Sequence, residues 1–76
     1  MNDKDILRDA VAFYKEKYKA INVNIHDAAT EMGRSPQTLV RMAERGEIKM
    51  TKIASTWHMT VYELARLTTG IDQEVA

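Results

Sequence analysis

The segment from residue 25 to residue 46, IHDAATEMGRSPQTLVRMAERG, constrains this chain most strongly. It carries the signals of two short helices that are joined by a tight turn. A small residue at Ala29 lets the two helices cross closely, Gly33 can turn the chain, and Leu39 can fill the wedge between the helices. The pattern therefore predicts a helix-turn-helix unit, with a first helix over about residues 25–32.

The second helix of this unit has a well-marked beginning. Ser35 is a strong N-cap residue, and Pro36 suits the first helical position, where its missing N–H costs nothing. We expect Gln37, Thr38 and Arg41 to follow on the exposed side of this helix. Residues in the first turn of a recognition helix, and one turn further on, are those that reach base edges in the major groove of DNA.

The residue types at these three positions suit base recognition. A glutamine amide matches the N6 and N7 edge of adenine, an arginine forks onto O6 and N7 of guanine, and threonine offers a hydroxyl and a methyl group. Contacts to the phosphate backbone are predicted for a second set of residues in and around the unit. These are His26, Arg34, Ser35, Arg45, Lys49 and Lys52.

The distribution of charge supports this assignment more than its sum does. Eleven basic and eleven acidic residues cancel over the whole chain, whereas a free-standing DNA-binding domain is usually basic. Residues 34–52 nevertheless hold five cations and two anions, a net charge of +3, and residues 53–76 hold one cation and three anions, a net charge of −2. The positive segment coincides with the predicted reading helix and the loop after it, which is where phosphate contacts are needed.

Length and composition exclude several other classes. Seventy-six residues make one small domain, expected over residues 1–70 with a tail at 71–76. The chain has no cysteine, so it has neither a disulfide framework nor a thiolate metal site. No acid pair, nucleophile–base arrangement or phosphate-binding glycine loop stands out, so we expect no enzyme activity, cofactor, metal or small-molecule substrate. No apolar run approaches the roughly 20 residues that span a bilayer, and a cytoplasmic protein is expected.

The rest of the chain is predicted to be helical. One helix is expected over about residues 3–19, capped by Asn2 or Asp3, and residues 21–24 are expected to form a short connection with Asn24 as the next cap. Further helices are expected over about residues 50–57 and 61–68, the latter with a T-x-x-E capping box that begins at Thr60. Three apolar residues near the end of the chain are candidates for contacts with a second subunit: Leu67, Ile71 and Val75.

Five helices, of which the second and third form the turn motif, resemble the repressor and Cro group of phage lambda and its relatives. The resemblance covers about residues 24–70 and is carried by AATEMGRSPQTLVRM and KIASTWHMTVYELARL. It implies an all-α, five-helix, lambda-repressor-like domain from a phage or bacterial transcriptional regulator. It also implies that Gln37, Thr38 and Arg41 are the base-reading residues. Members of this group commonly bind operator DNA as homodimers and act as repressors.

Two other interpretations remain open. The sequence SPQTLVRMAERGEI also resembles the motif of excisionases and mercury-regulator-type winged-helix proteins, which place a β-hairpin after the motif. Residues 48–53 could supply one strand of such a hairpin, but residues 54–67 are predicted to be helical. Small helical domains also serve as protein-interaction modules, such as antitoxins and anti-repressors, and the neutral net charge favours this class.

Overall fold

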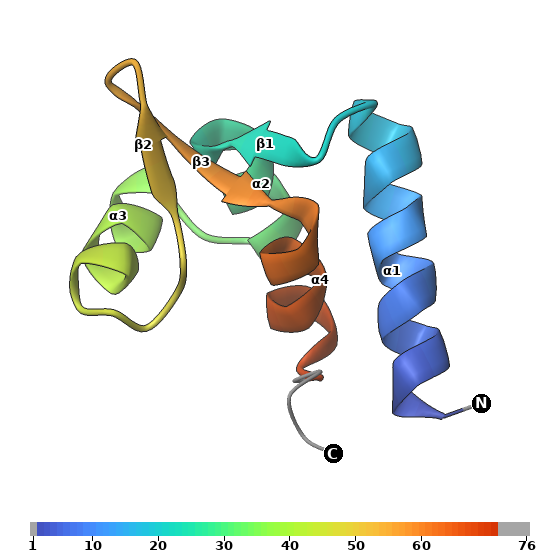
Figure 1. Cartoon of the computed structure of the whole chain (residues 1–76). Coiled ribbons are helices and arrows are strands. Elements are labelled where there is room, and N and C mark those ends of the chain that lie inside the picture. Colours follow the sequence, from blue (N-terminus) through green and yellow to red (C-terminus); the bar gives the residue numbers. More distant parts are fainter. Residues whose placement is uncertain (1, 72–76) are drawn as a thin grey trace.

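Helices and strands are mixed in the computed structural model of the chain, which describes residues 2–71 (Figure 1). Four helices and a three-stranded antiparallel sheet follow one another in this part of the chain. In chain order they are α1 (Asp3–Tyr18), β1 (Asn22–Asn24), α2 (Ile25–Met32), α3 (Pro36–Glu44), β2 (Thr51–Ile53), β3 (Thr56–Thr60) and α4 (Val61–Thr69). The prediction of an all-α, five-helix domain is therefore wrong.

The helices begin at the polar residues that cap them. The side chains of Asn2, Asn24, Ser35 and Thr60 each accept a hydrogen bond from the backbone N–H three residues further on. Each cap satisfies one of the N–H groups that the first turn of a helix leaves without a partner. The predicted starts of these four helices are confirmed, and α2 has the bounds that the sequence predicts.

Residues 50–57, predicted as a helix, instead form β2 and the start of β3. The two strands pair with Ile53 opposite Thr56, so that only Ala54 and Ser55 lie in the turn. Both turn residues have positive φ, 51° and 70°, which is the requirement of a type I′ hairpin turn. This turn normally carries Asn-Gly or Asp-Gly. Because Ala-Ser gives no such signal, residues 54–67 are predicted to be helical, although residues 48–53 are compatible with the first strand of a hairpin.

The third strand comes from a segment that was predicted to be a plain connection. β1 pairs with β3, Val23 lying opposite Met59, and the sheet has the order β1-β3-β2. His58 and Met59, expected in a turn between helices, lie within β3. The sheet thus joins the segment before the helix-turn-helix unit to the segment after it, and so fixes the hairpin relative to α2 and α3.

The core lies between the sheet and the helices. Among residues 2–71, twelve apolar side chains are buried there: Leu7, Tyr14, Val23, Ile25, Ala28, Ala29, Leu39, Ile48, Met59, Val61, Leu64 and Ala65. α1 packs antiparallel to α4 at one side of the molecule, and α3 and the hairpin lie at the other side (Figure 1). Leu67 and Ile71, two of the proposed subunit contacts, pack against this core, and Val75 lies outside the described residues. Within residues 2–71, no helix is both long enough and apolar enough to cross a membrane.

Candidate nucleic-acid interface

One face of α3 presents two of the predicted base-reading residues to solvent, Gln37 in the first turn and Arg41 in the last turn. Leu39 is fully buried and fixes the inner side of the helix, so Gln37 and Arg41 lie exposed on the outer side. They are four residues apart, which places them one above the other on one helix face. A glutamine amide and an arginine guanidinium therefore extend from neighbouring positions on one exposed face.

Thr38 differs from these two residues. It is half-buried, and its hydroxyl lies 2.8 Å from the Ser35 hydroxyl, while its backbone N–H donates to the same Ser35 oxygen. The predicted triad is thus brought together, but the Thr38 hydroxyl is already engaged by the helix cap. The Ser35 hydroxyl, a predicted phosphate contact, is likewise engaged by the cap, although Ser35 is exposed to solvent.

The β2–β3 hairpin, which we call the wing (residues 51–60), lies on the same side of the molecule as α3 (Figure 1). Every residue from 51 to 56 is exposed. The ammonium group of Lys52 lies 5.9 Å from the centre of the Trp57 ring, a distance at which a cation is attracted to the ring face. Lys52, predicted to contact phosphate from a loop, thus lies on a wing strand with its side chain supported by a tryptophan.

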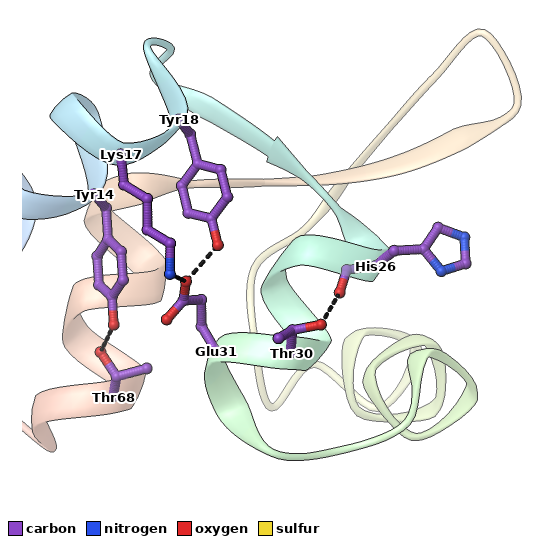
Figure 2. A network of polar contacts seen from close by, with 7 residues as sticks. All are labelled: Tyr14, Lys17, Tyr18, His26, Thr30, Glu31 and Thr68. Carbon is purple, nitrogen blue, oxygen red and sulfur yellow. Dashed lines mark hydrogen bonds and ion pairs between the residues drawn. The ribbon is translucent and has the colours of Figure 1, made fainter.

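The remaining candidate phosphate contacts divide into free and engaged side chains. Arg34 and Lys49 are exposed and take part in no ion pair within the described part of the chain, and the same holds for Arg41 of the base-reading set. Arg45 is also exposed but is paired with Glu47 in the neighbouring loop. His26 is exposed at the first turn of α2, and its ring points away from the polar network between α1 and α2 (Figure 2).

A buried carboxylate positions the loop that joins α3 to the wing. Glu63 on α4 accepts the backbone N–H of Lys49 at 2.8 Å and two hydrogen bonds from Arg66, at 2.7 and 2.8 Å. The Arg66 guanidinium, and then the Lys49 amide, hold the pKa of this carboxyl below its usual value against the opposing effect of burial. The sequence assigned Glu63 to a capping box, but its carboxylate instead ties α4 to residue 49. No local sequence signal indicates this long-range contact.

A second network holds α2 against α1. The Glu31 carboxylate accepts hydrogen bonds from Tyr18 and, at 2.5 Å, from the Lys17 ammonium group (Figure 2). These two donors lower the pKa of Glu31, and burial together with the Glu31 carboxylate raises the pKa of Tyr18. Beside them the Tyr14 hydroxyl donates to the Thr68 hydroxyl at 3.0 Å. The Glu31 contacts thus hold α2, the first helix of the turn motif, against α1, and the Tyr14 contact holds α1 against α4.

Comparisons with protein-family models, with curated proteins and with solved structures yield no match for this chain. The functional assignment therefore rests on the residues of the chain and on the fold that places them. That fold combines a helix-turn-helix formed by α2 and α3 with a hairpin that follows it directly.

Proposed function

We propose that this chain binds double-stranded DNA with sequence preference and acts as a transcriptional regulator, by placing α3 in the major groove and the wing beside it. The observation that carries the proposal is the exposed pair Gln37 and Arg41 on one face of α3, a helix that lies on the same side of the molecule as the wing (Figure 1). An α-helix fits the major groove, where the amide and guanidinium groups have complementary partners on base edges.

Three exposed cations around this pair support the same proposal. Arg34 precedes the N-cap of α3, Lys49 follows the helix, and Lys52 lies on the wing. Three cations that lie before, after and beside a recognition helix can bind DNA phosphates and so fix the position of the helix on the duplex, without contacting the bases. The zero net charge of the chain does not describe this side of the domain, because Arg66 and Lys17 are paired with largely buried acids, Glu63 and Glu31, in the domain body.

The wing places Lys52 differently from the predicted five-helix domain. In a five-helix domain, residues 50–57 would have formed another helix, and residues 49 and 52 would have lain in or near a loop. In this fold the strands hold Lys52 on a hairpin whose position is fixed by β1 on one side and by Glu63 on the other. One copy therefore offers the DNA two rigid elements, α3 and the wing.

The experiment that tests this function is a selection of bound duplexes from a random pool, with the full chain as bait. We expect enrichment of a short motif whose binding weakens as salt rises, with a slope of about 0.9 in log–log form for each phosphate neutralised. The control is the double variant Gln37→Ala/Arg41→Ala, which should bind the pool weakly but enrich no motif. Failure of the unmodified chain to enrich any sequence would overturn the proposal.

A further inference from the structure

Two rows of opposite charge run along exposed parts of α1. Their members have identical spacing, four and then seven residues, and the second row is displaced from the first by one residue. The basic row is Lys4, Arg8 and Lys15, and the acidic row is Asp5, Asp9 and Glu16. At 100° per residue, all three members of a row fall within a narrow sector of the helix surface, and the two sectors lie about 100° apart.

Each row borders a different apolar surface. The basic row edges a groove between α1 and α4 whose apolar lining includes Leu7, Val11 and Tyr62. The ammonium group of Lys15 lies 5.2 Å from the centre of the Tyr62 ring at this groove. The acidic row lies beside Ile6 and Phe13, which are 38% and 59% exposed.

We propose that this groove receives α1 of a second copy of the chain. The two α1 helices would run parallel, with Asp9 of one copy beside Arg8 of the next and Glu16 beside Lys15. In this arrangement the exposed ring of Phe13 packs towards the apolar lining of the groove. The identical spacing of the two rows allows each acid to meet a base in a single register.

The contact joins two different surfaces of the chain, so it is heterologous. In a pair, one copy keeps its groove unused and the other keeps its acidic row unused, and contacts of this kind build open chains unless the rotation between copies closes a ring. α1 lies at the side of the molecule away from α3 and the wing (Figure 1). The association therefore leaves the proposed DNA contacts uncovered, and it does not depend on the proposed function.

Existing ion pairs on α1 do not block the contact. Arg8 lies 3.3 Å from Asp5 and 3.8 Å from Asp9 of its own helix, and Lys19 lies 2.6 Å from Glu16. All of these side chains are solvent-exposed, and exposed pairs of this kind contribute about 0–1 kcal/mol. They can be exchanged for pairs between copies at little cost. A contact made mainly by one helix about 24 Å long belongs to the class of small, weak interfaces.

The test is sedimentation of the full chain without DNA, from roughly 10 µM to roughly 1 mM. At about 20 mM salt we expect the weight-average mass to rise with concentration beyond that of a dimer, and at about 500 mM salt we expect it to fall towards that of the monomer. Arg8→Glu/Lys15→Glu and Asp9→Lys/Glu16→Lys should each weaken the association by at least about tenfold, because like charges then face each other.

The four-fold variant that carries both pairs of changes has the net charge of the original chain and should regain the association. Lys49→Glu/Lys52→Glu is the control for altered net charge, because it matches the first double variant in charge but leaves α1 intact, and it should associate as the original chain does. Circular dichroism verifies that each variant is folded. A monomer under all conditions, a plateau at the dimer, or a folded four-fold variant that stays monomeric would overturn the proposal.

Discussion

The polar side chains on the α1 side of the molecule differ from those on the side of α3 and the wing in whether they have partners within the protein. Where α1 meets α2 and α4, the polar groups are partnered across elements: Lys17 and Tyr18 with Glu31, and Tyr14 with Thr68. On the side of α3 and the wing, Gln37, Arg41 and their neighbours extend into solvent. A polar group that is satisfied internally contributes to the free energy of unfolding, whereas one that is left free is available to a ligand.

Besides the sheet, which pairs β1 with β3, the two sides are connected at the loop between α3 and the wing. The Glu63 carboxylate, which is 7% exposed, reaches from α4 to the backbone N–H of Lys49. Substitutions on the packed side, where α1 meets α2 and α4, should therefore lower the free energy of unfolding and leave the DNA sequence preference unchanged. Substitutions on the exposed face of α3 should alter the sequence preference and leave the free energy of unfolding nearly unchanged. Glu63 is the place where both effects can appear together.

The largest effect on stability is expected from Glu63→Gln. The variant removes a charge that holds Arg66 and the Lys49 amide, and hydrogen bonds to charged groups contribute about 1.5–3 kcal/mol each, so we expect unfolding to become easier by about 2 kcal/mol. Denaturant unfolding at neutral pH measures this change. Thr68→Val, which removes the Tyr14 contact on the packed side, serves as the control and should cost less.

The same variant has a characteristic pH dependence. Because the folded-state pKa of Glu63 is lowered below its ordinary value of 4.5, its contribution is fully present above that value and is lost as the pH falls through the lowered pKa. The stability of the original chain should therefore decline on acidification, and the difference from Glu63→Gln should shrink. A difference that stays constant down to acid pH would contradict the assigned charge contacts.

The second largest effect is expected from Arg41→Ala on the exposed side of α3. Loss of one bidentate base contact costs about 1–3 kcal/mol of discrimination, or roughly 5- to 150-fold in the ratio of specific to non-specific affinity. The free energy of unfolding should stay within about 0.5 kcal/mol of its original value, because the side chain is exposed. Titrations of the selected site and of an unrelated duplex at one salt concentration measure the ratio. An unchanged ratio would remove Arg41 from the reading surface.

A smaller and favourable effect is expected in the wing turn. Ala54 and Ser55 adopt left-handed backbone conformations that cost L-residues with a Cβ roughly 1 kcal/mol. Ala54→Asn/Ser55→Gly supplies the residues that a type I′ turn prefers, so it should stabilise the domain by about 1 kcal/mol. Thermal unfolding measures this gain. A loss of stability instead would mean that the hairpin does not turn at these two residues.

The smallest effect is expected from Lys52→Ala. Removing one phosphate contact should weaken binding to all duplexes alike and reduce the slope of log affinity against log salt by about 0.9. Lys19→Ala, a change of the same charge on the packed side, is the matched control and should leave the slope unaltered. A change in base preference caused by Lys52→Ala would show instead that the wing reads sequence.

Much of the fold can be predicted from short-range sequence signals such as helix caps. The hairpin was wrongly predicted as a helix because its turn lacks such a signal. The caps at Asn24, Ser35 and Thr60 fix where helices begin, because a side-chain oxygen next to unpaired N–H groups acts locally. The wing has no such marker, since its turn is Ala-Ser. The alternation of apolar Trp57 and Met59 with polar Thr56, His58 and Thr60 is the sequence signal that indicates β3.

Only those parts of the candidate site that depend on local sequence signals could be predicted. Gln37 and Arg41 follow from the cap and the helical repeat, both of which are local. The tie between Glu63 and residue 49 joins positions 14 residues apart in the sequence, and no local pattern specifies it. The pairing of β1 with β3 is similarly non-local. Because of this pairing, residues 22–24, which were predicted to be a connection, form a strand.

The most direct test of the central claim, that α3 and the wing together form the DNA-binding surface, is an NMR titration with a duplex that holds one selected site. We predict the largest amide chemical-shift changes at residues 34–41 and 51–57, with the amides of α1 nearly unchanged. The largest changes on α1, or no changes at saturating duplex, would contradict this account.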